Sequence, residues 1–211
     1  MQNIYDKDYY ENGIATGKSC YQNYQWLPEL TIRMAYNLMK YLGLDEQDLV
    51  LDYGCGKGYL VKAFRLLDIQ AFGCDISEYA FEKTDPDVKE YCKLIPPDLK
   101  IPFEEKFDWM ITKDVLEHID EPVLDIVLEQ AKNHTQNMFH VIPLGDDSKF
   151  RIEAYHNDPS HVQMQDEGWW RKKFEQHGWN VQRFDYQVRG IKENWTRKFS
   201  KGNGFFVLER T

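Results

Sequence analysis

The sequence predicts an α/β fold in which a mostly parallel sheet carries helices on both faces. Residues 49–51 are a short apolar run of the kind that forms a buried parallel strand. Three glycines at alternate positions follow, and residues 59–67 then place apolar side chains at helical spacing. Further apolar runs at residues 69–77, 88–94, 107–113 and 137–143 alternate with helical segments, which is typical of parallel sheets.

The composition narrows the class of protein. The chain has 211 residues, a hydrophobic content of 42% and a net charge of −9. The acidic balance argues against a nucleic-acid partner, which normally requires a basic patch. No apolar run approaches the roughly 20 residues of a membrane helix, so we expect no membrane insertion. Four widely spaced cysteines favour a reduced, cytoplasmic protein, and the oligomeric state is left open.

The glycines at positions 54, 56 and 58 predict a tight turn between strand and helix. Such a turn lets a nucleoside ligand approach the backbone closely. A dinucleotide fingerprint, G-x-G-x-x-G, needs its third glycine at position 59, where this chain has Tyr59. The spacing therefore disfavours a dinucleotide, and an NAD-dependent oxidoreductase becomes the weaker alternative.

A second strand is predicted to end in an acid, Asp75, which lies 23 residues beyond Asp52. A carboxylate at this position can accept two hydrogen bonds from ribose hydroxyls. We expect it at the exposed end of its strand, where it contributes little to packing. The alternative is that Asp75 only caps the next helix, because Asp is a favoured N-cap residue.

Three stretches together resemble the class I S-adenosylmethionine-dependent methyltransferases. The D-x-G-x-G-x-G pattern at residues 52–58 resembles motif I of that family, and residues 107–119 resemble its F-D-x-V…D-V-L-E-H-x signature. Asp158-Pro159-Ser160-His161-Val162 resembles the D-P-x-H-V stretch that many members carry over the cofactor. These motifs occur in the family's order, and the resemblance covers roughly residues 45–210 by the matching of elements.

The resemblance implies a Rossmann-like seven-stranded sheet that ends in an antiparallel pair, here residues 179–188 and 204–208. It implies S-adenosyl-L-methionine as cofactor, bound by a methyltransferase domain at residues 45–211, with residues 1–44 as an N-terminal arm and helix. The cofactor-binding residues that it implies are Asp52, Gly54, Cys55, Gly56, Asp75, Ile76 and Lys113. What reads the adenine stays open, because Pro97 stands where the family's Asp is commonest and Asp98 is one residue late.

Two histidines are the candidates for general base catalysis. His118 and His161 qualify because imidazole titrates near neutral pH. His118 has an alternative role, since in this signature it can simply pack beside the cofactor. His156 lies in the loop at residues 144–160 and is predicted to contact the acceptor. No D…D-N metal constellation is visible, so we expect no metal.

Residues 1–26, the arm before the predicted helix, hold five of the chain's thirteen tyrosines. This arm is either a surface segment or an aromatic lid over the active site, because tyrosine excludes water yet keeps a polar tip. Tyr9 and Lys18 are predicted to contact the acceptor. Residues 13–19 look like a phosphate-binding loop but have one residue too few between the glycines.

The small size and the lack of a separate recognition domain favour a small-molecule acceptor. Residues 9–13 and 26–29 are similar to segments of small bacterial methyltransferases associated with capsule and surface-glycan biosynthesis. That resemblance implies an acceptor oxygen on a sugar or on a nucleotide- or phosphate-linked precursor. A non-catalytic partner protein that keeps the methyltransferase fold is the remaining alternative.

Overall fold

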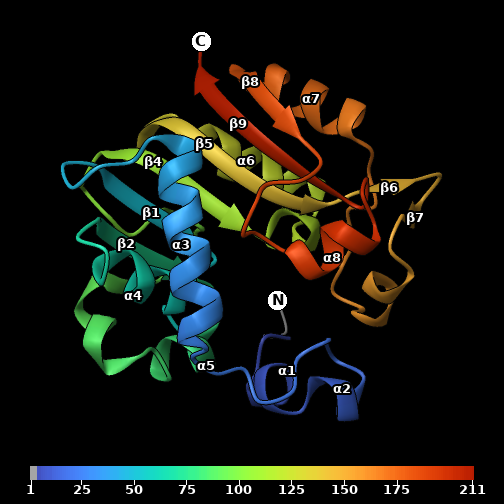
Figure 1. The fold of residues 1–211 in the computed structure, drawn as a ribbon, viewed down its shortest axis with the longest axis horizontal. Coiled ribbons are helices and arrows are strands. Elements are labelled where there is room, and N and C mark those ends of the chain that lie inside the picture. Colours follow the sequence, from blue (N-terminus) through green and yellow to red (C-terminus); the bar gives the residue numbers. More distant parts are fainter. Residues whose placement is uncertain (1–3) are drawn as a thin grey trace. The chain divides into compact units, whose positions relative to one another are not determined.

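The computed structural model describes residues 4–211, and its main sheet confirms the predicted α/β fold class. The sheet has seven strands in the order β3-β2-β1-β4-β5-β9-β8 (Figure 1). The chain divides into two compact units, one running to Phe103 with residues 157–160, the other formed by residues 104–156 and 161–211. The predicted arm and domain boundary at residue 44 stays a prediction, and its first three residues lie outside the described part of the chain.

In the first unit, β1 (Leu49–Tyr53) pairs in parallel with β2 (Gln70–Asp75), and β2 with β3 (Cys92–Leu94). The helix α3 (Pro28–Leu42) begins at its proline and ends before Gly43, which adopts a φ of 76°. It packs on α4 (Tyr59–Arg65). The short helices α1 (Lys7–Glu11) and α2 (Gly13–Thr16) belong to the same unit, and α1 packs against α5 (Glu78–Glu82).

The predicted strand at residues 88–94 is wrong over its first part. Residues Pro86–Tyr91 form the 3-10 helix η1, and only Cys92–Leu94 pair with β2. The Asp85 side chain accepts a hydrogen bond from the Asp87 amide, and Pro86 occupies the first turn. These start signals outweigh the apolar positions that suggested a strand.

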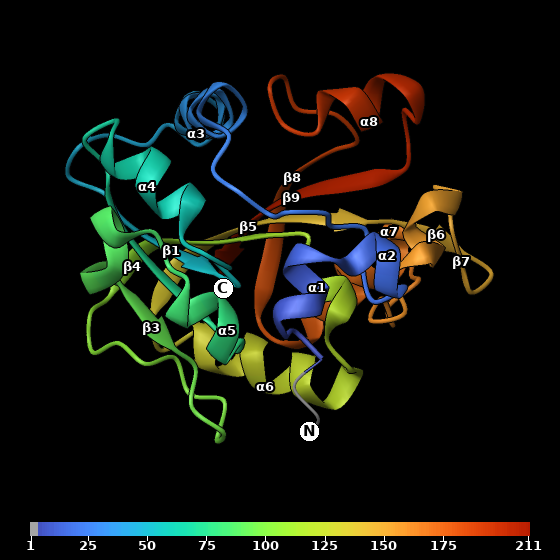
Figure 2. The ribbon, with the colours of Figure 1, turned by 90° about the horizontal axis from the view of Figure 1, so that it is seen from below.

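In the second unit, β4 (Phe107–Lys113) pairs in parallel with β5 (Thr135–Pro143). The predicted closing pair is confirmed, since β9 (Asn203–Arg210) runs antiparallel to both β5 and β8 (Trp179–Asp185). Figure 2 shows α6 (Glu121–Ala131) and α8 (Glu193–Lys198) on opposite faces of these strands. The core of the unit is aromatic, with these side chains fully buried: Phe139, Trp170, Phe174, Trp179, Phe205 and Phe206.

The segment predicted as a loop after β5 has structure of its own. It contains a small hairpin, β6 (Gly145–Asp146) with β7 (Lys149–Phe150), and the 3-10 helix η3 (Glu153–Asn157). Arg151 holds the segment by donating to Asp146 at 2.6 Å and to Glu167 of α7 (Glu167–Gln176) at 2.8 Å. Among the described helices, none combines the length and the apolar character needed to span a bilayer.

Candidate functional site

The glycine turn after β1 has the conformation that its three glycines predict. Gly54, Gly56 and Gly58 adopt φ values of 82°, 56° and 76°, which L-residues rarely tolerate. The amides of Gly54 and Cys55 both donate to the Cys74 carbonyl, at 2.8 and 3.1 Å. The turn is therefore fastened to β2, whose end carries the predicted ribose acid.

Asp75 is buried, with an exposed fraction of 7%, so the expectation that it lies at an exposed strand end is wrong. Its Oδ2 accepts a hydrogen bond from the Gly56 amide at 2.7 Å, and its Oδ1 accepts one from the Ser77 amide at 2.8 Å. Burial raises the pKa of Asp75, and these backbone donors offset part of that rise. The carboxylate is thus oriented by the glycine turn itself.

The alternative that Asp75 is a helix cap is also wrong. Ser77 is the N-cap of α5, and its side chain accepts from the Ala80 amide at 3.0 Å. The Gly56 and Ser77 amides donate to different oxygens of Asp75, and a carboxylate oxygen has a second lone pair for a ligand hydroxyl. Next to this acid, Ile76 is 40% exposed, whereas Asp52 and Cys55 are buried in the strand and the turn. The cofactor roles of these residues stay predictions.

The N-terminal arm covers the glycine turn within the first unit. We call Tyr5, Tyr9, Tyr10, Tyr21, Tyr24 and Tyr79 the tyrosine cluster; with Ala80 they form one packed group. A Cβ added at Gly56 would lie 3.4 Å from the Tyr24 hydroxyl, so this ring lies directly against the turn. Lys57, in the turn, donates to Glu11 at 2.5 Å and to the Tyr24 carbonyl at 2.7 Å. Sequence reasoning noticed the tyrosines but missed this tether, because the two partners are 46 residues apart.

The three predicted acceptor contacts have partners inside the protein. The Tyr9 hydroxyl is buried and donates to Asp158 at 3.1 Å. Lys18 pairs with Asp6 at 2.6 Å and with Asp8 at 3.5 Å. His156 accepts a hydrogen bond from the Phe150 amide at 3.0 Å through Nε2. The contact of these three side chains with an acceptor stays a prediction. Each would have to give up its hydrogen bond or ion pair within the protein in order to bind the acceptor.

Lys113 lies in the second unit, in an ion-pair network centred on Asp114. Lys113 donates to Asp114 at 2.6 Å, and Lys192 donates to the other carboxylate oxygen and to Asn203 at 2.8 Å. Burial alone would raise the pKa of Asp114, but the two lysines hold it well below its usual range. Asp114 and Lys192 both adopt a positive φ, 55° and 51°, an uncommon conformation for residues other than glycine.

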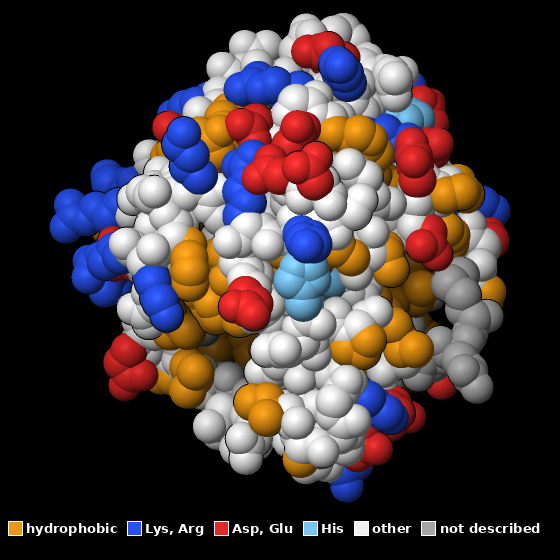
Figure 3. All heavy atoms as spheres, turned by 90° about the vertical axis from the view of Figure 1, so that its right-hand side faces the viewer, with side chains coloured by type: hydrophobic (Ala, Val, Ile, Leu, Met, Phe, Trp, Pro, Cys, Tyr) orange, Lys and Arg blue, Asp and Glu red, His pale blue; other side chains and the backbone are white. Residues whose placement is uncertain are grey.

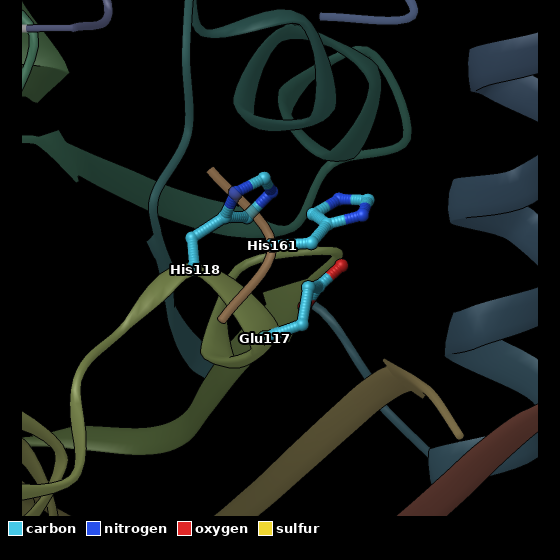
Figure 4. Close-up of side chains that lie close together, drawn as sticks. All are labelled: Glu117, His118 and His161. Carbon is cyan, nitrogen blue, oxygen red and sulfur yellow. The ribbon is translucent and has the colours of Figure 1, made fainter. Parts of the chain in front are cut away.

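The two predicted base candidates lie together in the second unit. His118 and Glu117 come from the 3-10 turn η2 (Leu116–His118), which follows β4, and His161 precedes α7. The ring centroids of His118 and His161 are 4.5 Å apart. Ligand atoms of Glu117, His118 and His161 all lie within 4.8 Å of one another, and Figure 4 shows the Glu117 carboxylate directed toward the His161 ring. Sequence reasoning paired the two histidines but did not identify Glu117 as part of the site.

The backbone holds the His161 segment against η2. The amides of Val162 and Gln163 both donate to the Glu117 carbonyl, at 2.8 and 3.0 Å, and the Gln163 side chain donates to the Ile119 carbonyl at 3.1 Å. His161 Nδ1 lies 2.7 Å from the Tyr155 carbonyl. These hydrogen bonds hold His161 beside Glu117 and His118, although His161 lies 43 positions after His118 in the sequence.

Comparison with known proteins identifies the family of this chain. A family model described as a methyltransferase domain matches residues 29–198. A search of curated proteins finds no match. Among solved structures, the chain is similar to the glycopeptide N-methyltransferase MtfA complexed with sinefungin, with a TM-score of 0.63 and 11% identity over 86% of this chain and 87% of that one.

Two further structures have the same fold. One is the magnesium protoporphyrin IX methyltransferase of Synechocystis with bound SAH, with a TM-score of 0.60 and 16% identity over 85% of this chain and 83% of that one. The other is an S-adenosylmethionine-dependent methyltransferase of Clostridium acetobutylicum, with a TM-score of 0.62 and 14% identity over 87% of this chain and 92% of that one. At these identities the likeness concerns the fold.

Proposed function

Because the chain belongs to the methyltransferase domain family, we propose that it transfers a methyl group from S-adenosylmethionine to a small-molecule acceptor. The observation that carries this proposal is the junction of the glycine turn with Asp75, whose carboxylate is fixed by the Gly56 amide at 2.7 Å. This arrangement suits a nucleoside, with backbone at close approach and an acid oriented toward ribose hydroxyls.

Tyr59 favours a sulfur nucleoside over a dinucleotide. It begins α4 at the position where a dinucleotide fingerprint has its third glycine, and its ring lies 5.3 Å from Tyr24 and 5.9 Å from Trp26, centroid to centroid. Aromatic rings therefore occupy the start of this helix, which a pyrophosphate would need to approach. The methionine part of S-adenosylmethionine makes no such demand.

The chemistry requires mainly positioning. S-adenosylmethionine supplies a methyl group that is already electrophilic, so the protein has to hold the acceptor in line and exclude water. An oxygen acceptor also has to lose a proton, and His118 or His161 is the proposed base, a role worth about 10²- to 10⁴-fold in rate. The tyrosine cluster is the proposed water-excluding cover of the cofactor turn.

The proposed acceptor is a sugar hydroxyl or a phosphate-linked oxygen of a precursor in capsule or surface-glycan biosynthesis. Support comes from the similarity of residues 9–13 and 26–29 to small bacterial methyltransferases of that kind. The net charge of −9 disfavours nucleic acid, and on the face seen in Figure 3 lysines and arginines are interspersed with acids rather than gathered in one patch.

Calorimetry of the purified chain with S-adenosylmethionine, S-adenosylhomocysteine and NAD tests the proposal. We expect binding of both sulfur nucleosides and none of NAD, followed by methyl transfer to a nucleotide-activated sugar among a panel of acceptors. Binding of NAD alone would show an oxidoreductase instead. Cofactor binding with no transfer to any acceptor class would favour the non-catalytic partner alternative.

A further inference from the structure

The side chain of Glu117 is buried in a way that calls for a positive partner. It has no exposed surface, and neither of its oxygens accepts a hydrogen bond from another described residue. A carboxylate removed from water without a partner destabilises the folded chain. Burial raises the pKa of Glu117, and the nearby Asp114 charge adds to that rise. The charge is thus left to a proton or to a bound cation.

The groups that face Glu117 are two imidazoles and the Asp114 network. Lys113 and Lys192 favour the charged form of Glu117, but both donate to Asp114. The two lysines are therefore paired with Asp114, and neither donates a hydrogen bond to Glu117. A ring nitrogen of His118 and one of His161 each lie within 4.8 Å of a Glu117 carboxylate oxygen.

The hydrogen bond of His161 sets its tautomer for metal binding. Nδ1 lies 2.7 Å from the Tyr155 carbonyl, and a carbonyl only accepts, so the ring proton belongs on Nδ1. The lone pair is then on Nε2. An imidazole that donates through one nitrogen to a backbone carbonyl and ligates through the other is the usual arrangement of a metal-binding histidine.

We propose that Glu117, His118 and His161 form a binding site for a divalent transition-metal ion such as Zn²⁺. Two imidazole nitrogens with one carboxylate oxygen suit Zn²⁺ and its first-row neighbours, whereas Mg²⁺ and Ca²⁺ prefer all-oxygen sites. Three protein ligands leave a coordination position for a ligand from solution, as in catalytic zinc sites. This site goes beyond methyl transfer and is testable without it.

Binding requires only a modest closure of the cluster. Ligands at about 2.0–2.1 Å from a tetrahedral ion lie about 3.4 Å apart, compared with the present spread of up to 4.8 Å. The main chain is already fixed by the two amide bonds to the Glu117 carbonyl, so side-chain rotation has to supply the difference. The expectation of no metal rested on the absence of a D…D-N pattern, which would supply oxygen ligands. The cluster proposed here supplies two imidazole nitrogens and one carboxylate oxygen instead.

The test is metal binding by the whole chain after treatment with a chelator. Titration with ZnCl₂ in a calorimeter should show one ion per chain, and Co²⁺ should give the visible absorption bands of a tetrahedral site. His161→Ala and the nearly isosteric Glu117→Gln should each weaken Zn²⁺ binding by at least about 100-fold. His134→Gln removes a histidine before β5, outside the cluster, and should leave Zn²⁺ affinity unchanged.

Several results would overturn the site. These are no Zn²⁺ binding, unchanged affinity in both cluster variants, or a preference for Mg²⁺ over Zn²⁺. A thermal melt of each variant with chelator present shows whether it folds, and Glu117→Gln keeps the volume of the side chain, so a folded variant is available for the titration. If Glu117 is simply protonated, Glu117→Gln will melt like the parent chain and no variant will differ in Zn²⁺ binding. Calorimetry with S-adenosylhomocysteine on the same samples reports the proposed function separately.

Discussion

Replacing Asp75 by asparagine separates its structural from its ligand-binding role. The carboxylate accepts from the Gly56 amide at 2.7 Å and from the Ser77 amide at 2.8 Å. An asparagine has one oxygen and one NH₂ group, so one of these two amides will face a donor and lose its partner. A buried N–H left without a partner costs about 1–3 kcal/mol. For a chain of this length that lowers Tm by roughly 2–4 °C for each kcal/mol.

The same substitution removes one acceptor for a ribose hydroxyl. A hydrogen bond to a charged group is worth about 1.5–3 kcal/mol, which corresponds to a rise in cofactor Kd of roughly 10- to 150-fold. Calorimetry with S-adenosylhomocysteine measures that Kd, and a melt without ligand measures the stability term. The matched control is Asp68→Asn, because Asp68 lies exposed in the turn after α4 of the same unit and adopts a φ of 63°, which asparagine tolerates.

The two readouts distinguish the roles of Asp75. A lower Tm together with a higher Kd supports an acid that both supports the turn and binds the ribose. A lower Tm with an unchanged Kd would refute the ligand role, because then the carboxylate serves only the two amides. If Asp68→Asn shifts the Kd equally, the effect is one of net charge rather than of contact.

Three further predictions concern the turn, the arm and a buried histidine. Gly56→Ala should weaken cofactor binding and lower the free energy of unfolding, because the φ of Gly56 is 56° and the new Cβ would lie 3.4 Å from the Tyr24 hydroxyl. The control is Gly17→Ala, which has the same backbone strain but nothing within 4 Å of the new Cβ. In a denaturant titration it should lower the free energy of unfolding by about 1–2 kcal/mol and leave cofactor binding unchanged. Lys57→Met should detach the arm by removing the bonds to Glu11 and the Tyr24 carbonyl, and limited proteolysis should then cut within residues 5–24 faster than in the parent chain; an unchanged cleavage rate would contradict the tether. Burial lowers the pKa of His140 to about 3, so between pH 6.5 and pH 3 the unfolded state binds more protons than the folded state. The free energy of unfolding should therefore fall by up to about 1.4 kcal/mol for each unit of decreasing pH. His140→Gln should flatten this slope, and an equally steep profile in the variant would exclude His140 as its source.

Much of the fold follows from local patterns. The helix at residues 28–42 begins at a proline and ends at a glycine, and both signals act within a few residues of the helix ends. The strand β4 is found at its predicted residues, Phe107–Lys113, because its apolar run is bounded by polar positions. The strand predicted at residues 88–94 is shorter, since the start signals at Asp85 and Pro86 favour a 3-10 helix over that run.

The glycine turn shows how far a motif predicts geometry. The spacing at residues 54–58 predicts close backbone approach, and the three positive φ values agree with it. The burial of Asp75 was not predictable in the same way, because residues distant in the sequence, Tyr10 of the tyrosine cluster among them, lie near its carboxylate. A sequence shows which residue ends a strand, but not which distant residues lie near that end in the fold.

The Glu117 cluster depends on a contact that no local pattern contains. Glu117 and His118 are neighbours on a 3-10 turn, and the sequence alone shows an ordinary acid beside a histidine. The amides of Val162 and Gln163 bring His161 to them by donating to the Glu117 carbonyl. In the same cluster the Glu117 side chain has no exposed surface. The sequence does not show that this acid is buried without a donor from another described residue, nor that His161 lies beside it, and both observations carry the proposed cation site.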